Sequence, residues 1–259
     1  MLLTVDVGNT EIVLGVFDGD ELRHTWRLST RSERTSDELA LQFSGLLEHA
    51  GLNLRRDVDG MCVASVVPDL TSALREMAES YLAFEPIFVG PGTKTGVPVL
   101  TDNPREVGAD RVVNTLAAFR RFGGPAIVVD FGTSTNFDVV SERGEFVGGV
   151  IGPGIQVSAA SLVSRTARLP RVELVAPPSV IGTNTVACIQ SALVFGTADM
   201  VDGIVRRIRV EIGEATTVAT GGLAPVVIPH CQTIQHHEPW LTLEGLRLVH
   251  ERNLEPADG

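Results

Sequence analysis

Asp6-Val7-Gly8-Asn9-Thr10 and Asp130-Phe131-Gly132-Thr133-Ser134-Thr135 are the two stretches that decide the fold of this chain. In each copy an apolar run, typical of a buried strand, leads directly into an aspartate and a glycine-containing turn. The two aspartates are 124 residues apart, as are the two glycines that follow them, and the next hairpin-tip glycines, Gly19 and Gly144, are 125 apart. Three matching points in register indicate an internal repeat, and therefore a duplicated fold.

The hydrophobic pattern around each stretch predicts the same succession of elements. An antiparallel meander of three strands comes first, and helices alternate with strands after it, as in a layered α/β sheet. We expect strands at residues 2–7, 12–17, 21–28, 61–67, 87–89, 126–130, 137–140, 145–151 and 217–220, and helices at about 35–50, 68–81, 112–122, 184–212 and 242–253. The predicted class is α/β, with two mixed sheets flanked by helices and domains at 1–116 and 117–259.

Composition argues against several classes of protein. The chain has 259 residues, of which 44% are hydrophobic, so it can bury a substantial core. A formal net charge of −11 argues against a nucleic-acid partner, because phosphate backbones are held by clustered lysine and arginine. We see neither a secretory leader nor an apolar run of roughly 18–20 residues, and expect a cytoplasmic protein with no membrane partner. Cys62, Cys188 and Cys231 fit neither a disulfide framework nor a zinc site.

Each aspartate turn suits a phosphate group. Glycine lets backbone N–H groups approach an anion, and the Asn, Ser and Thr side chains of the turns add neutral donors. Two ordinary polar hairpins are the alternative, but an aspartate in both copies favours phosphate binding. Like charges about 4 Å apart repel by roughly 4 kcal/mol at an effective dielectric constant of about 20, so a cation must intervene, and Mg²⁺ is the obvious candidate. The chain lacks a P-loop and a kinase-type glycine loop.

These patterns carry a resemblance to known families. Duplicated Asp-x-Gly turns and a late strand ending in Gly221-Gly222 resemble the actin-like superfamily of acetate and sugar kinases and Hsp70 ATPases, which implies duplicated actin-like (ribonuclease H-like) domains. Five motifs resemble the type III pantothenate kinase family more closely: residues 6–10, 102–111 and 130–133, Gly152-Pro153-Gly154, and Gly182-Thr183-Asn184-Thr185. This resemblance implies an ATP-dependent enzyme that phosphorylates pantothenate to 4'-phosphopantothenate, the first step of coenzyme A biosynthesis.

The resemblance also implies roles for individual residues. We expect the ATP phosphates to contact Asp6, Val7, Gly8, Asn9, Thr10, Glu11, Ile12, Val13 and Thr133. We expect pantothenate to contact Gly108, Ala109, Asp110, Arg111 and Thr185, with Asp110 as the general base. Asp130 is expected to bind a monovalent cation, K⁺ or NH₄⁺, and Asp6 to lie beside the Mg²⁺ that accompanies ATP. The helix at 184–212 is expected to contribute to a homodimer.

Ordinary structural roles stay open for several of these residues. Asp110 and Arg111 suit the start of a helix, where the macrodipole favours an acidic side chain. Thr185 follows Asn184, a good helix N-cap, and the long helix after it is equally compatible with burial within one chain. His236-His237 is interpreted as a solvated loop pair rather than a metal site.

Two other functions are compatible with the same two aspartate turns. One is a kinase of another small hydroxylated acid or sugar, and the other is a non-catalytic transcription accessory factor, against which the carboxylates at 6, 110 and 130 argue. Two residues depart from the family pattern. Thr101 stands where the family often has an aromatic residue, and Asn136 stands where threonine or an apolar residue is more usual.

Overall fold

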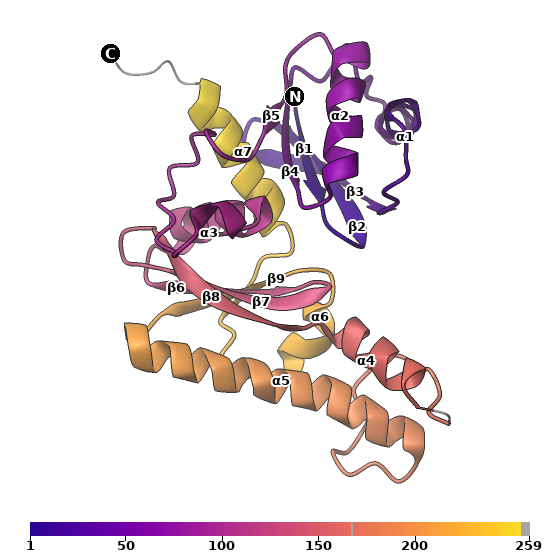
Figure 1. Ribbon diagram of the computed structural model, residues 1–259, viewed down its shortest axis with the longest axis vertical. Helices are drawn as coiled ribbons and strands as arrows, with labels where there is room; N and C mark the ends of the chain where they lie inside the picture. The colour runs from indigo at the N-terminus through magenta and orange to yellow at the C-terminus, as the bar shows by residue number, and fades with distance from the viewer. Residues whose placement is uncertain (167, 255–259) are drawn as a thin grey trace. The chain divides into compact units, whose positions relative to one another are not determined.

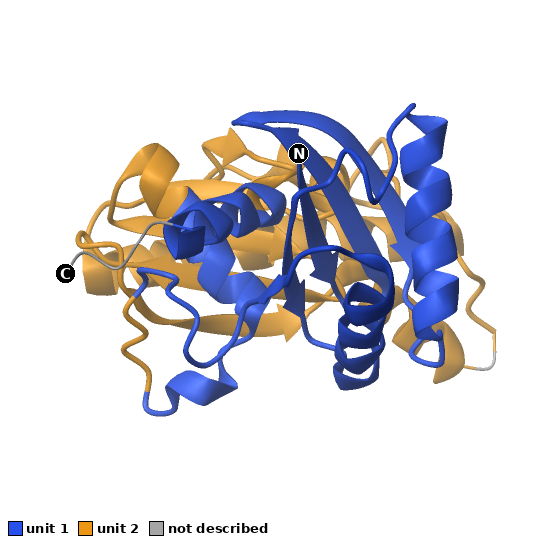
Figure 2. Cartoon of the chain, turned by 90° about the horizontal axis from the view of Figure 1, so that it is seen from above, with its two compact units in different colours: residues 1–97, 102–117, 242–259 blue, residues 98–101, 118–241 orange. Residues whose placement is uncertain are grey.

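The computed structural model describes residues 1–166 and 168–254 and divides into two compact units (Figure 2). Unit 1 comprises residues 1–97, 102–117 and the described residues from Thr242 onward, and unit 2 comprises residues 98–101 and 118–241. Each unit has its own sheet and its own hydrophobic core. The chain is therefore two layered α/β structures.

Unit 1 is built on a mixed sheet in the order β3-β2-β1-β4-β5 (Figure 1). Its central strand, β1, pairs antiparallel with β2 and parallel with β4. Leu3, Val5 and Val7 of β1 are buried in one core with apolar residues of α1 and α2. The elements are β1 (Leu2–Val7), β2 (Glu11–Asp18), β3 (Glu21–Ser29), α1 (Ser36–His49), β4 (Gly60–Ser65), α2 (Pro68–Tyr81), β5 (Ile87–Phe88), η1 (Pro104–Glu106), and most of α3 (Ala109–Phe122) and α7 (Leu241–Leu254).

Unit 2 repeats this topology. Its sheet has the order β8-β7-β6-β9-β10, so its first strand is again central, antiparallel to the second and parallel to the fourth. The elements are β6 (Ala126–Phe131), β7 (Ser134–Val140), β8 (Phe146–Pro153), α4 (Ile155–Ser164), α5 (Thr185–Ile212), β9 (Thr216–Thr220), α6 (Ala224–Val227), η2 (Ile228–His230) and β10 (His236–His237). The duplication predicted from the sequence is confirmed.

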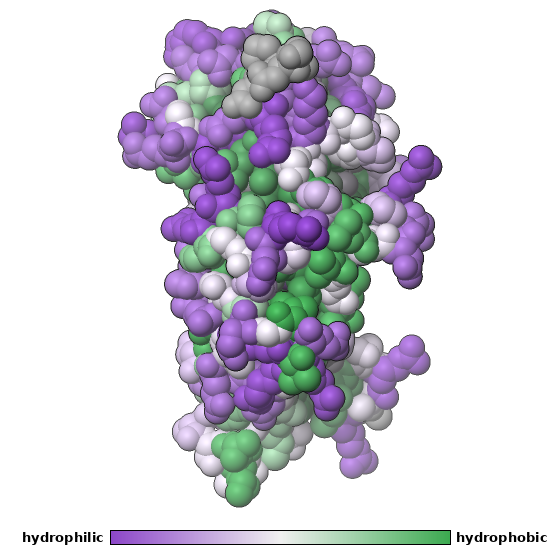
Figure 3. Space-filling model, turned by 90° about the vertical axis from the view of Figure 1, so that its left-hand side faces the viewer, coloured by the Kyte–Doolittle hydropathy of each residue, from purple (hydrophilic) through white to green (hydrophobic). Residues whose placement is uncertain are grey.

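The long helix α5 lies along the sheet of unit 2 (Figure 1). By length and mean hydropathy, 1.3, it contains a window apolar enough to cross a membrane, contrary to the sequence-based expectation, but 44% of that window is buried inside the protein. Val194, Val201 and Val205 have no exposed surface and belong to the core of unit 2. One side of α5 is therefore part of the core of unit 2. The face drawn in Figure 3 carries both hydrophobic and hydrophilic residues.

The compact units differ from the predicted domain ranges chiefly in α7, which the division at 116/117 assigned to the second domain. Leu243 of α7 packs against Gly15, where a Cβ atom would lie 2.8 Å from the leucine Cδ1. Arg247 donates a 2.7 Å hydrogen bond to Asp20 at the tip of the β2–β3 hairpin. These contacts join distant parts of the sequence, so α7 groups with unit 1.

The short elements β10, α6, η1 and η2 were not predicted. His236 and His237, expected in a solvated loop, form β10, which pairs parallel with β9 because Gln235 and Glu238 donate backbone hydrogen bonds to that strand. Both histidines are nevertheless exposed. The four-residue helix α6 contains a proline and is too short for a helical hydrophobic period to show in the sequence.

A buried carboxylate fastens α5 to the segment before β10. Asp202 is 2% exposed and accepts hydrogen bonds from the backbone N–H groups of Gln232 (2.8 Å) and Thr233 (2.9 Å) and from the Thr233 hydroxyl (2.7 Å). Asp202→Ala should lower the free energy of unfolding by about 2–4 kcal/mol, because it leaves buried donors unpaired.

Urea denaturation measures this effect, and the exposed Asp199 of the same helix gives a matched control. Asp199→Ala should change stability by less than about 0.5 kcal/mol. Equal midpoints for the two variants would mean that Asp202 does not fasten this segment.

Candidate functional site

The first aspartate turn is a tight connection between β1 and β2. The Gly8 N–H donates to the Glu11 carbonyl at 3.0 Å, and a Cβ at Gly8 would lie 3.2 Å from that oxygen, which favours glycine here. Thr30, just after β3, donates its hydroxyl to the Gly8 carbonyl (2.7 Å) and its N–H to the Thr10 carbonyl (2.9 Å). Arg27 of β3 pairs with Glu11 at 2.8 Å. The turn is therefore held from its side by the end of β3.

Further segments of unit 1 meet at the same edge of the sheet. β1 and β4 are parallel, and Val66, just after β4, donates its N–H to the Val7 carbonyl at 3.0 Å. A Cβ at Gly108 would lie 3.7 Å from a methyl group of Val66, which places the start of α3 beside this connection. Two of the predicted segments, 6–13 and 108–111, thus lie at the carboxyl edge of β1 and β4, where open α/β sheets bind ligands.

The predicted ATP-binding residues differ in what they expose. The side chains of Val7 and Ile12 are fully buried in the core of unit 1, so only their backbone atoms are available to a ligand. Asn9, Thr10 and Glu11 are exposed. Asp6, Gly8 and Val13 are half-buried, with Asp6 paired to Val13 across β2. The turn therefore presents polar groups to solvent over an apolar base.

Asp110 lies in the first turn of α3. Its Oδ1 accepts the Arg111 N–H at 2.9 Å and packs so closely over Gly108 that a Cβ there would overlap it. Burial raises the pKa of Asp110 above its usual range, although the N–H and the guanidinium of Arg111 both act to lower it. A carboxylate with a raised pKa is a stronger base, which is the property that a proton acceptor needs.

The second aspartate turn, in unit 2, has a different construction. It is one residue shorter, because the Gly132 N–H donates to the Ser134 carbonyl at 3.0 Å. Asp130 pairs with Asn136 on β7 and with Thr220 on β9, while Thr133 is exposed. The Ser134 hydroxyl donates to the Asn136 side-chain oxygen at 2.9 Å, so Asn136 takes part in the hydrogen bonds of this turn.

Two glycines approach this second turn closely. Gly221 has φ +92°, and a Cβ there would lie 2.5 Å from the Asp130 Oδ1. Gly154 donates its N–H to the Thr133 carbonyl at 3.2 Å. The Gly-Pro-Gly and Gly-Gly motifs of the sequence thus have a physical role, since their lack of side chains lets other backbone segments approach the turn.

Thr185 is the first residue of α5 and is exposed. Asn184 caps the helix by accepting the Ala187 N–H at 2.9 Å. The capping role proposed for Asn184 is therefore confirmed, and the substrate role of Thr185 stays a prediction. Thr30 and Val66 support the first turn and Gly154 supports the second, but none of the three was assigned to a site from sequence, because only hydrogen bonds and close approach reveal them.

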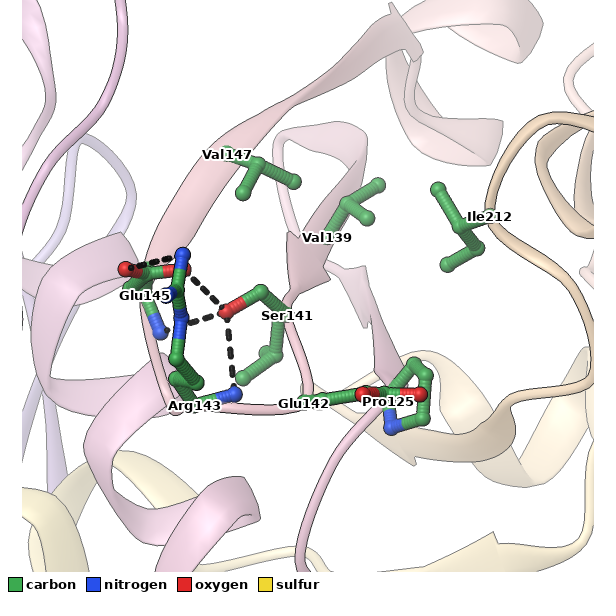
Figure 4. A pocket seen from close by; sticks show the side chains of 9 residues that line it. Pro125, Val139, Ser141, Glu142, Arg143, Glu145, Val147 and Ile212 are labelled. Carbon is green, nitrogen blue, oxygen red and sulfur yellow. Dashed lines mark hydrogen bonds and ion pairs between the residues drawn. The ribbon is translucent and has the colours of Figure 1, made fainter.

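A surface pocket of unit 2 is lined by none of the predicted site residues (Figure 4). It surrounds the tip of the β7–β8 hairpin, where Ser141 donates to Glu145 at 2.7 Å and Arg143 pairs with Glu145 at 3.3 Å. These polar groups satisfy one another, so the pocket carries no functional assignment. The described part of the chain holds no group of three or more His, Cys, Asp or Glu side chains arranged for a metal. A magnesium ion carried by nucleotide phosphates needs only one or two carboxylates.

Comparison with known proteins gives matches over most or nearly all of the chain. The model of the type III pantothenate kinase family matches residues 2–207. The type III pantothenate kinase of Parafrankia sp. (strain EAN1pec) is 54% identical over 259 residues, covering 99% of this chain and 100% of that protein. The type III pantothenate kinase of Moorella thermoacetica is 52% identical over 254 residues, covering 98% and 100%.

Structural comparison identifies the fold. The ROK hexokinase from Thermus thermophilus has a TM-score of 0.52 at 13% identity and covers 98% of this chain and 99% of that chain. The predicted fold class, duplicated actin-like domains, is therefore confirmed. Since the family model spans residues 2–207 and relatives more than half identical match from end to end, the chain belongs to the type III pantothenate kinase family.

Proposed function

We propose that this enzyme transfers the γ-phosphoryl group of ATP to the primary hydroxyl of pantothenate, giving 4'-phosphopantothenate and ADP in the first step of coenzyme A biosynthesis. The proposal rests on the placement of Asp110 at the edge of the unit 1 sheet, next to the turn at 6–13 that Thr30 holds by hydrogen bonds. Burial raises the pKa of this carboxyl group. A proton acceptor and a phosphate-binding turn are the two parts that phosphoryl transfer to an alcohol requires.

The chemistry follows from these parts. Asp110 accepts the proton of the pantothenate hydroxyl while the hydroxyl oxygen attacks the γ-phosphorus of ATP. The bond from that phosphorus to the bridging oxygen breaks, and ADP leaves with the bond's electron pair. Arg111, next in the chain, offers a fork of donors to the carboxylate or amide oxygens of pantothenate. Gly108, Ala109 and Thr185 complete the proposed contacts with pantothenate, and Thr133 joins those with ATP.

Two cations are part of the proposal. Mg²⁺ supplies charge neutralisation for the ATP phosphates, and the half-buried Asp6 suits it, because a carboxylate beside polyphosphate needs a cation between them. K⁺ or NH₄⁺ is assigned to Asp130, whose carboxylate is enclosed by Gly221 and by the strand partners Asn136 and Thr220. Oxygen ligands of this kind suit hard monovalent cations.

We assign the enzyme to the cytoplasm and propose that it works as a homodimer. Exposed apolar side chains on α4 and at the start of α5, Val157, Leu162 and Val186, support a subunit contact in that region. A kinase of another small acid or sugar and a transcription accessory factor are the rival functions. The half-buried carboxylates at 6, 110 and 130 favour an enzyme over the accessory factor.

The acceptor is tested by coupled ADP release. With ATP, Mg²⁺ and K⁺ present, pantothenate should give turnover, and a panel of other hydroxylated acids and sugars should give at most a small fraction of it. A larger kcat/KM for any other acceptor would assign the enzyme to that substrate. If the protein binds ATP but releases no ADP with any of these acceptors, the result would favour the transcription accessory factor over a kinase.

Asp110→Asn tests the proton acceptor. The variant should lose about 100- to 10,000-fold in kcat, because the amide cannot accept the hydroxyl proton. It should keep or slightly raise thermal stability at neutral pH, since it removes a charge that burial disfavours. Asp69→Asn, an exposed aspartate in the first turn of α2, is the matched control and should retain wild-type kcat. Unchanged turnover in Asp110→Asn would assign the proton to another group.

The pH dependence of kcat/KM follows from the same carboxyl group. Only the deprotonated form accepts a proton, so activity should fall as pH drops through a pKa above the ordinary aspartate value of about 3.9. For stability the sign is opposite. The contribution of the protonated carboxyl is complete below that ordinary value and is lost as pH rises through the raised folded-state pKa. An acidic limb at or below about 3.9 would contradict the assignment.

Exchange of the monovalent cation tests Asp130. Replacing K⁺ and NH₄⁺ by Na⁺ at constant ionic strength should lower kcat/KM about tenfold or more, the loss expected when one charged contact is weakened. Asp130→Asn should show that low activity in all three salts. Equal activity of the wild-type enzyme in K⁺ and Na⁺ would remove the cation from the mechanism.

A further inference from the structure

The segment that joins β3 to α1, residues 30–35, is bonded to the turn at 6–13. Thr30 at its start bonds to both Gly8 and Thr10, which fixes the segment against the turn at 2.7 and 2.9 Å. At its end Thr35 caps α1 in a capping box with Glu38. The segment between these anchors is short and contains a turn in which the Arg34 N–H donates to the Arg31 carbonyl at 3.3 Å. Arg34 therefore lies between two fixed ends, in a short segment that starts at the proposed ATP-binding turn.

The guanidinium of Arg34 is not used by the fold of the described residues. Its Nη1 is buried without a hydrogen-bond partner there, and no carboxylate of the described chain lies within ion-pair distance of it. The acidic side chains nearest in sequence have other partners. Glu33, which directly precedes Arg34, accepts the Ser32 hydroxyl at 3.4 Å. Asp37 accepts the Tyr81 hydroxyl at 2.6 Å, and Glu38 accepts the Thr35 N–H at 2.9 Å.

The position itself is unfavourable for a cation. Arg34 directly precedes the N-cap of α1, where the helix dipole and unpaired N–H groups favour negative charge. A buried and unpaired guanidinium N–H adds a further cost. An anion bound beside Arg34 would remove both penalties, because it would accept the Arg34 N–H groups and complement the N-terminal end of α1.

We propose that Arg34 is a phosphate-binding residue of the ATP site, donating to the non-bridging oxygens of the nucleotide's β- and γ-phosphates next to the turn at 6–13. The inference rests on the proposed function for the identity of the ligand. Planar guanidinium groups bind phosphate oxygens in pairs, which a lysine ammonium does not reproduce. Arg34 therefore acts on the phosphates, whereas Asp110 acts on the acceptor.

Nucleotide binding to Arg34→Gln tests the proposal. Titration calorimetry with ATP and Mg²⁺, without pantothenate, should show a dissociation constant about 10- to 100-fold weaker than that of the wild type. Adenosine, which has no phosphate, should bind both proteins within about twofold. The ATP dissociation constant of Arg34→Lys should lie between those of the wild type and Arg34→Gln. Arg23→Gln is the matched control, because Arg23 lies at the β2–β3 hairpin near Asp18 and Glu21, and it should bind ATP as the wild type does.

A thermal melt separates this role from a structural one. Without nucleotide, Arg34→Gln should melt at or above the wild-type temperature, since it removes an unpaired buried group, and ATP should raise its melting temperature less than that of the wild type. ATP affinity within twofold of wild type in Arg34→Gln, equal weakening of ATP and adenosine, or a lower melting temperature in both Arg34 variants would overturn the proposal. Since no acceptor is present, failure of pantothenate phosphorylation leaves this test intact.

Discussion

The pairing of each central strand on both sides is the constraint on which the rest of this structure depends. β1 is bonded to β2 and β4, and β6 to β7 and β9, so neither strand can slide without breaking two ladders. Their side chains are buried on both faces, and a shift of one residue would bring Asp6 or Asp130 into a core position. The carboxylates at the strand ends are therefore placed by the cores, and the turns after them start from fixed points.

The two units share one sheet topology, but their aspartate turns are built differently. The first turn is longer and is supported from its side by Thr30, while the second is shorter and is closed in by Gly154 and Gly221. Different supports leave different groups exposed, with Asn9 and Thr10 at one turn and Thr133 at the other. The two turns are thus built differently enough to fit the different roles proposed for Asp6, beside polyphosphate and its divalent ion, and for Asp130, beside a monovalent cation.

The sequence predicted the fold well where local signals and burial agree. The bounds of β1 and α2 match the structure residue for residue, because β1 is an apolar run ended by a glycine turn and α2 begins with a proline at its first position. The placement of α7 with unit 1 was not predictable, because contacts such as Leu243 with Gly15 join residues far apart in the chain. At the candidate site the motifs single out Asp110, whose role stays a prediction, whereas the hydrogen bonds of Thr30 to the turn carry no sequence signature.

The candidate site is also where this chain departs from what stability alone would select. Asp110 is held where burial disfavours its charged form, Arg34 precedes a helix whose dipole opposes it, and Gly221 adopts a φ that other residues rarely accept. The unfavourable free energy of these residues is offset elsewhere, by the two hydrophobic cores and by buried hydrogen bonds such as those of Asp202. Groups that cost stability in this way are typical of ligand-binding sites, and the proposed function accounts for them, because a polyphosphate with its cations and an acceptor hydroxyl would complement these charges.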